Sequence, residues 1–483
     1  MNYFGLDAMS AVEKQSMRDL AIRGGPFTNE ERLALLDYCQ SDVDATAMLA
    51  RKMSGRIDLP RALIRGRYVN CVARMESAGI PVDSETLGLL RGNWQVIRTG
   101  LISRIDRDRV FDGGSFRQRR WEEWVSEHGI VWPRLPSGVL SLDQDTFKEM
   151  SRIHPEVAPY KELRITLNHL RIHDLPVGPD GRNRTMLSPF GSRTGRNQPR
   201  SSQFIFGPAK WLRTLVRPEP GRALAYLDFE QQEFGIAAAL SRDLKMMEAY
   251  KSDDPYLAFA KQAGAVPPDA TRDSHPKERA LFKTCSLGVQ YSMGEQTLAS
   301  RIRQSHAHAR ELINLHRATY SDYWRWSEGV QDYAIMNGGL TAAFGWRVRS
   351  GSEPNPCFLR NFPLQANGAE ILRLACIFAV EAGVTLCAPV HDALLIESDE
   401  DQIEEAVSRC EAAMEKASQV VLGGFSIRVE AKVILYPERF TSSDGSRVWE
   451  EIKILLSELS RARPACTKPT HLDGTPVSSL HLL

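Results

Sequence analysis

The sequence predicts an α/β fold of the α+β kind, in which helices dominate and a few strands cluster in the second half of the chain. Apolar residues make up 42% and charged residues 25% of the 483 residues, which are ordinary values for a globular protein. Apolar residues recur at helical spacing over much of residues 30–170 and 243–335, whereas β-rich runs occur after residue 220. At ~150 residues per domain, the length suggests roughly three domains or subdomains.

Charge and composition exclude several classes of protein. Lys and Arg number 61 against 60 Asp and Glu, so a nucleic-acid binder of this composition must concentrate its basic groups on one surface. No apolar run reaches the ~18 residues that cross a bilayer, and the N-terminus lacks the apolar stretch of a secretory signal. The eight cysteines are scattered without a Cys-x-x-Cys pair, which argues against a zinc ribbon or a disulfide scaffold. We therefore expect a cytoplasmic protein with no membrane partner.

Helical patterns fill the first third of the chain. Thr28 or Asn29 is a candidate cap for a helix over Glu30–Met53, and a second helix is expected from Arg61, just after Pro60. Residues 84–170 are mostly helical, with breaks at 113–114 and 133–136. The next stretch, 176–220, is rich in Gly, Pro, Arg, Asn and Ser, which predicts a long loop system of a kind that is often functional.

Strands enter after this loop system. A strand is predicted over Ala223–Phe229, closely followed by a helix from Glu233. Two short β-rich runs flank the dipeptide His391-Asp392. The other expected elements are helices within 243–335 and at 362–380, 404–420 and 448–459, a pair of strands around 340–348, and strands at 384–390, 393–397 and 425–434. Residues after Pro464 are expected to fray.

Two aspartates stand at the ends of apolar strands. Asp228 follows Ala-Leu-Ala-Tyr-Leu, and Asp392 lies between two apolar runs. A carboxylate in such a place is costly unless a positive charge compensates it, and Mg²⁺ prefers hard oxygen ligands. Side by side, the two could hold two metal ions ~3.5–4 Å apart for phosphoryl displacement. Alternatively, each aspartate serves only as a hairpin-turn residue.

The segment 275–291 places a basic residue, a second basic residue, an apolar residue and an aromatic residue at intervals of four, namely Arg279, Lys283, Leu287 and Tyr291. On a helix these form one slowly winding stripe ~18 Å long. The stripe could match a triphosphate, a sugar and a base in that order. The alternative is a solvated basic face that continues into a half-buried apolar stripe.

Several blocks occur in an order that is specific as a set. They are Thr194-Gly195-Arg196, Asp228-Phe-Glu-Gln-Gln-Glu233, Arg279-x3-Lys283-x3-Leu287-x3-Tyr291-x2-Gly294, Asn361-x3-Gln365 and Val390-His391-Asp392. Together they resemble the polymerase region of family A DNA polymerases, the bacterial DNA polymerase I type, with the second, third and fifth blocks as motifs A, B and C. The likeness begins near Arg74-Met-Glu-Ser-Ala-Gly-Ile-Pro-Val-Asp83 and covers about residues 60–440.

The resemblance implies a right-hand polymerase fold with palm, fingers and thumb. On this basis we expect an exonuclease-like remnant at 1–58, a thumb and primer-template region at 59–215, palm at 216–242 and 337–440, fingers at 243–336, and a C-terminal helix and tail at 441–483. The implied partners are primer-template DNA and dNTPs, and we expect a monomer.

The resemblance also implies roles for individual residues. Asp228, Asp392 and the backbone carbonyl of Phe229 would bind two Mg²⁺ ions. Arg279 and Lys283 would grip the triphosphate. The remaining implied roles are Tyr291 at the nascent base pair, Glu233 as the steric gate against a 2′-hydroxyl, Leu287 in the sugar pocket, and Arg196, Gln365 and His391 on primer, template or nucleotide.

The chain departs from the family pattern at several positions. Ala393 replaces the glutamate that follows the motif C aspartate, so a carboxylate near the metal site is missing. Leu287 replaces a Phe or Tyr, which leaves sugar discrimination open. The other departures are Cys285-Ser286, Ser292 and Gly235. These positions suggest a divergent member of the family, and they keep open a catalytically weakened DNA-binding replication factor as an alternative. A single-subunit RNA polymerase is a third possibility, which Glu233 disfavours.

The N-terminal stretch carries a further, weaker likeness. Tyr38-Cys-Gln-Ser-Asp42 resembles the block that ends a proofreading 3′–5′ exonuclease domain. The acidic block that such a nuclease needs does not precede it in this sequence. We therefore expect no proofreading and interpret residues 1–58 as a vestige or as the tail of a split or truncated gene. An ordinary polar helix is the alternative.

Overall fold

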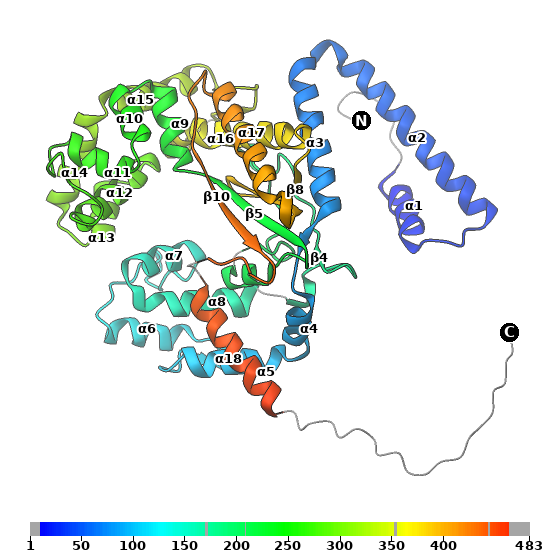
Figure 1. Cartoon of the computed structure of the whole chain (residues 1–483), viewed down its shortest axis with the longest axis horizontal. Coiled ribbons are helices and arrows are strands. Elements are labelled where there is room, and N and C mark those ends of the chain that lie inside the picture. The colour runs from blue at the N-terminus through cyan, green and yellow to red at the C-terminus, as the bar shows by residue number, and fades with distance from the viewer. Residues whose placement is uncertain (1–9, 170–171, 208, 352–354, 443–444, 463–483) are drawn as a thin grey trace. The chain divides into compact units, whose positions relative to one another are not determined.

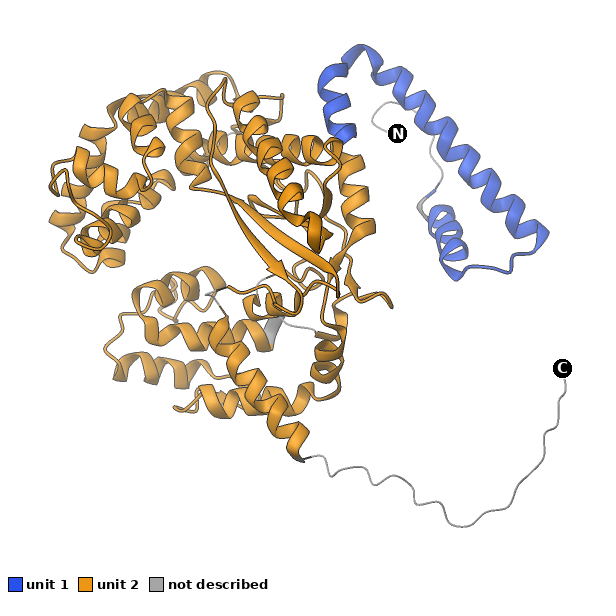
Figure 2. Ribbon diagram, viewed as in Figure 1, with its two compact units in different colours: residues 1–67 blue, residues 68–483 orange. Residues whose placement is uncertain are grey.

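The computed structural model of the chain describes residues 10–169, 172–207, 209–351, 355–442 and 445–462. The chain forms two compact units, residues 1–67 and residues 68–483 (Figure 2). Within the described ranges, no helix is long and apolar enough to cross a membrane. The described cysteines, seven in number, are all free thiols.

The first unit is helical in its described part. It contains α1 (Ala11–Arg23), α2 (Asn29–Met53) and the start of α3 (Leu59–Ala78). Thr28 caps α2 in a reciprocal capping box with Glu31, which confirms the predicted helix start. Pro60 lies in the first turn of α3, where its missing N–H costs no hydrogen bond. Local sequence signals therefore set the boundaries of these helices.

The centre of the second unit is a four-stranded antiparallel sheet in the order β10-β5-β9-β8. Its strands are β5 (Arg222–Phe229), β8 (Thr385–Val390), β9 (Ala393–Asp399) and β10 (Val429–Leu435). Alternate residues of β5, from Ala223 to Phe229, are fully buried on the face that helices α16 (Pro356–Glu381) and α17 (Ile403–Val421) cover (Figure 1). The other face carries the half-buried Tyr226 and Asp228. Leu224, on this same face, is fully buried, so the face is less covered only towards the Asp228 end of β5.

Two groups of helices flank the sheet (Figure 1). The first comprises α9 (Gln232–Ser241), α10 (Leu244–Lys251), α11 (Pro255–Gln262), α12 (Pro276–Gln290), α13 (Glu295–Ile302), α14 (His306–Thr319) and α15 (Ser321–Met336). The second comprises α4 (Ser84–Gly92), α5 (Trp94–Ile105), α6 (Gln118–Glu127), α7 (Gln144–Ile153), α8 (Ala158–His169) and the C-terminal α18 (Ser446–Ala462), which packs on α5. Short antiparallel pairs complete the unit: β1 (Ile80–Pro81) with β4 (Arg182–Asn183), β2 (Phe111–Asp112) with β3 (Ser115–Phe116), and β6 (Gly339–Thr341) with β7 (Arg347–Arg349).

Two predicted boundaries differ from the structure by four residues or more. The helix expected at 362–380 begins at Pro356, because Asn355 caps it and a proline suits the first helical position. The strand expected from residue 425 begins at Val429. Residues 427 and 428, which precede the observed strand, donate their backbone N–H groups to side chains and not to a neighbouring strand. Ile427 donates to the Ser418 hydroxyl, and Arg428 donates to the Tyr250 hydroxyl. The tail after Pro464 lies outside the described residues.

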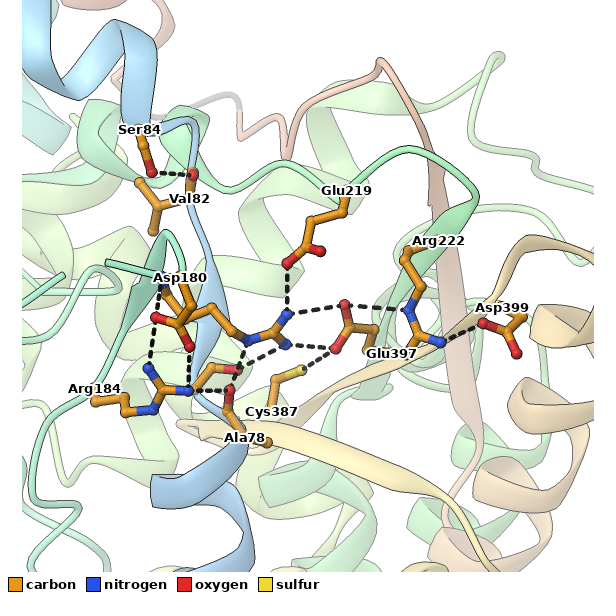
Figure 3. A network of polar contacts seen from close by, with 12 residues as sticks. Ala78, Val82, Ser84, Asp180, Arg184, Glu219, Arg222, Cys387, Glu397 and Asp399 are labelled. Atoms are coloured by element: carbon orange, nitrogen blue, oxygen red, sulfur yellow. Dashed lines mark hydrogen bonds and ion pairs between the residues drawn. The ribbon is translucent and has the colours of Figure 1, made fainter. Parts of the chain in front are cut away.

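A buried carboxylate ties the loop system 176–220 to the sheet (Figure 3). Glu397 of β9 is 4% exposed and receives Arg182 Nη2 at 2.5 Å and Arg222 Nε at 3.6 Å. Arg182 also donates to the carbonyl of Ala78, at the end of α3, at 2.6 Å. Arg222 reaches the exposed Asp399 on its other side. One acid therefore joins β4, β5 and β9.

A buried histidine makes the first group of helices sensitive to acid. Trp324 Nε1 donates to His316 Nδ1 at 3.0 Å, so the ring proton is on Nε2. Within the described residues that Nε2 atom has no hydrogen-bond partner, and the rings of Phe259 and Tyr320 pack around it. Burial lowers the pKa of His316 to about 3.

We expect the free energy of unfolding to fall as the pH drops through this window. Between pH ~6.5 and the folded pKa, the unfolded chain binds a proton that the folded chain cannot hold, and the change from pH 7 to pH 5 costs ~2 kcal/mol. Chemical denaturation at pH 7 and at pH 5 measures this change in the free energy of unfolding. His316→Phe, which removes the titrating group, should show a pH difference smaller by that amount, and an equal difference in the two proteins would contradict the assignment.

Candidate active site

The two candidate aspartates converge at one end of the sheet. Asp228 is the penultimate residue of β5 and is directly opposite Ala393, the first residue of β9. His391 and Asp392 form the two-residue turn between the paired residues Val390 and Ala393, and His391 has the positive φ of 60° that such a turn requires. Asp392 is therefore both a hairpin-turn residue and a sheet-end neighbour of Asp228. The two interpretations of the sequence, metal ligand and hairpin-turn residue, are therefore compatible for Asp392.

The electrostatics of this pair are those of a site that suits a cation. Burial first, and then the negative charges of Asp392 and Glu430, raise the pKa of Asp228 to about 7. Burial likewise raises the pKa of Asp392. Asp228 Oδ1 is buried and, within the described ranges, has no hydrogen-bond partner. A divalent cation would satisfy this oxygen and remove the repulsion, so the residues present fit Mg²⁺.

The remaining ligands of such an ion would come from elsewhere. In the described part of the chain, no cluster of three or more His, Cys, Asp and Glu side chains could hold a metal by itself. Phe229, whose carbonyl is a candidate ligand, ends β5, and its ring is buried on the helix-covered face. Mg²⁺ usually keeps several waters and binds one or two carboxylates together with substrate phosphates. Two carboxylates and a backbone oxygen therefore match the ligands that Mg²⁺ usually takes from a protein.

A polar chain connects the acid pair to the loop system and to α12. Tyr291, which follows α12, donates to Glu233 Oε1 at 2.8 Å, and Arg196 Nη2 lies 3.7 Å from the same oxygen. Glu233 is in the first turn of α9, directly after β5. Burial raises the pKa of Tyr291, and the charge of Asp392 contributes to the rise. The structure thus brings Tyr291, Glu233 and Arg196 together beside the aspartates.

A cavity of about 400 Å³ adjoins His391. Arg196, Lys210 and Arg213 line it, as do the rings of Tyr68 and Phe206. Burial and then the positive charge of Arg213 lower the pKa of His391, so its imidazole is neutral at pH 7. A neutral imidazole with three nearby cations suits a polar, anionic ligand.

The predicted stripe lies along α12 and just beyond its end. Arg279 forms an ion pair with Asp254, and Lys283 Nζ lies 5.6 Å from the centre of the Tyr256 ring. Leu287 is half-buried, and Tyr291 is 49% exposed.

Gln365 lies on α16, where it is half-buried. In the described part of the chain it shares no hydrogen bond with Arg196, Glu233 or Tyr291, which contact one another. Sequence reasoning missed Asp254, Arg213 and Glu430. The dipeptide Asp254-Pro255 is a helix-start signal, so the sequence could have predicted Asp254 as a helix cap. It could not have predicted that arginines pair with Asp254. Glu430 is opposite Asp228 on β10, which only the strand register shows.

Comparisons with known proteins identify a family and several relatives that are similar to this chain. Residues 206–435 match the model of DNA polymerase family A. DNA polymerase I of Chloroflexus aurantiacus is 24% identical over 81% of this chain and 45% of its own length. The DNA polymerase of Mycobacterium phage L5 is 27% identical over 51% of this chain and 40% of its own length. The chain therefore spans less than half of the length of these two relatives.

A solved structure shares the fold. The POL domain of Pol1 from M. smegmatis, in complex with DNA primer-template and dNTP, superposes with a TM-score of 0.63 at 20% identity, over 86% of this chain and 77% of that domain. The mixed helix and strand fold predicted from the sequence is confirmed, and its architecture is that of a polymerase domain. Residues 206–435 are thus similar to DNA polymerase family A, the family that the sequence blocks also resemble.

Proposed function

We propose that this chain is a DNA-directed DNA polymerase that adds dNTPs to a primer 3′ end. The observation that supports it most is the convergence of Asp228 and Asp392 at one sheet end, beside Tyr291, Glu233 and Arg196. The family match and the polymerase relatives support the same reaction.

The proposal assigns the parts of the right hand to the observed elements. The sheet, with α9, α16 and α17, is the palm (216–242 and 337–440), and the helices within 243–336 are the fingers. The region 59–215 contributes the thumb and the primer-template surface. Residues 1–58 remain a proposed exonuclease-like remnant, in which Tyr38 and Asp42 both lie on α2.

The proposed mechanism is phosphoryl transfer assisted by two Mg²⁺ ions. Bound between Asp228 and Asp392, the ions would supply Lewis acidity to the primer 3′-hydroxyl and to the leaving pyrophosphate. Arg279 and Lys283 would hold the triphosphate and balance its charge. Glu233, oriented by Tyr291, would close the sugar pocket against a 2′-hydroxyl. Lys210, Arg213 and neutral His391 would hold the primer end in the cavity beside them.

Primer extension with purified protein tests the proposal. A labelled primer-template is incubated with Mg²⁺ and, in separate reactions, with dNTPs and with rNTPs. We expect template-dependent extension with dNTPs only. Extension with rNTPs alone would instead indicate an RNA polymerase, and binding of DNA without synthesis in both Mg²⁺ and Mn²⁺ would indicate a catalytically weakened replication factor.

A further inference from the structure

Two arginines from different segments converge on one buried carboxylate at the start of α11. Asp254 is 8% exposed, and its Oδ2 accepts Arg272 Nε at 2.8 Å and also Arg279 Nε. Its other oxygen, Oδ1, caps α11 by accepting the N–H groups of Tyr256 and Leu257 at 3.2 Å each. Oδ2 of Asp254 therefore pairs with the two arginines, and Oδ1 caps α11.

The way in which the arginines are held leaves their outer nitrogens available. Both bind through Nε, and in the described part of the chain neither guanidinium has a hydrogen bond at its Nη atoms. The side chain of Arg272 is 59% exposed and that of Arg279 is 24% exposed. Two positive charges on one negative charge leave the trio with a net charge of +1, and the exposed Lys283 follows Arg279 by one helical turn. Paired Nη forks are suited to bidentate contacts with phosphate oxygens.

Asp254 remains charged in this arrangement. Burial alone would raise its pKa, but hydrogen bonds from Arg279 and Arg272 outweigh burial and hold the pKa of Asp254 below its ordinary value. The carboxylate can therefore fix both guanidinium planes at neutral pH. Fixed donors lose less conformational entropy when they bind an anion than free side chains do.

We propose that Arg272 is a further substrate-binding residue, which forms with Arg279 a two-arginine clamp for the terminal phosphates of a nucleoside triphosphate, and that Asp254 positions both. This inference rests on the proposed polymerase function. The direction of α12 supports a nucleotide as the ligand, because the helix leads from Arg279 through Lys283 to Tyr291, which contacts Glu233 beside the aspartates. A DNA backbone phosphate is the competing source of the same chemistry.

Three variants separate these roles. Arg272→Ala removes one fork, and Arg272→Lys keeps the charge without the fork. Asp254→Asn keeps an oxygen that can cap α11, since Asn is as good a cap as Asp, but it loses the charge that holds the arginines. Arg325→Ala is the matched control, because Arg325 is a 78% exposed arginine of α15 that pairs with Asp322.

We expect Arg272→Ala and Asp254→Asn to raise the dNTP KM about tenfold, as for a lost charge-assisted hydrogen bond, with kcat within about twofold. Arg272→Lys should be intermediate, and Arg325→Ala should match the unmodified protein. Inorganic tripolyphosphate should inhibit both affected variants about tenfold more weakly. The affinity for primer-template DNA, measured by fluorescence anisotropy, should not change.

The clamp is overturned if Arg272→Ala leaves the dNTP KM and the tripolyphosphate inhibition unchanged. A loss of DNA affinity at constant tripolyphosphate inhibition overturns it as well, and assigns Arg272 to the DNA backbone. Asp254→Ala, which also removes the cap of α11, serves as the comparison for stability. If Asp254→Asn lowers the melting temperature as much as Asp254→Ala, the positioning role is wrong. Calorimetric binding of tripolyphosphate needs no catalysis, so it decides the clamp even if the protein extends no primer and the proposed function fails.

Discussion

Replacement of Asp228 or Asp392 by asparagine should abolish primer extension and leave DNA binding nearly intact. An amide keeps the size of the side chain but loses the negative charge that would hold Mg²⁺ between the strand ends. Lewis-acid stabilisation is worth several kcal/mol, so we expect a loss of ~10³-fold or more in rate. DNA affinity should persist, because phosphate contacts of Lys and Arg dominate it.

Single-turnover extension and anisotropy on the same protein preparations measure the two effects. Asp401→Asn, an exposed acid beyond the end of β9, is the matched control and should retain full activity. At pH 8 without divalent ions, Asp228→Asn should not lower the melting temperature, since the charged carboxylate is disfavoured at that site. Normal extension by either active-site variant would show that the metal assignment is wrong.

Replacement of Glu397 by alanine should give the largest loss of stability among single substitutions in the network of Figure 3. Glu397 is 4% exposed and faces two arginines, of which Arg182 has only 13% of its side chain exposed. Removal of one partner of a buried ion pair leaves an uncompensated charge and costs ~3–5 kcal/mol. Equilibrium denaturation at pH 7 measures the change in the free energy of unfolding.

The same network supplies its own control. Asp399 pairs with Arg222 but is 54% exposed, so Asp399→Ala should cost only ~0.2–1 kcal/mol. If Glu397→Ala costs no more than Asp399→Ala, the buried acid does not tie the loop system 176–220 to the sheet.

Much of the fold follows from signals that neighbouring residues carry. The capping box of Thr28 and Glu31 set the start of α2, and the apolar run 223–229 became β5 with an error of one residue. The turn at His391-Asp392 was readable because two β-rich runs flank it. Residues 425–428 were wrongly expected to continue a strand, because their competing partners, Ser418 and Tyr250, are on other elements.

Contacts between distant segments were not predictable in the same way. Arg182 and Glu397 are 215 positions apart, and Arg279 meets Asp254 across 25 positions. Nothing in the local pattern of either partner identifies the other. Such pairs depend on which strands are adjacent and which faces are buried, and these choices minimise exposed apolar surface over the whole unit.

The sequence by itself determined which residues stand at the strand ends and along one face of α12. These positions depend only on the local periodicity of strands and helices, which extends over a few neighbouring residues. Tertiary structure alone decided that Asp228 is opposite Ala393 on one side and Glu430 on the other, and that Asp254 lies between two arginines. The physical reason is strand register: a shift of one residue would turn Asp228 from the open face of the sheet to its buried face.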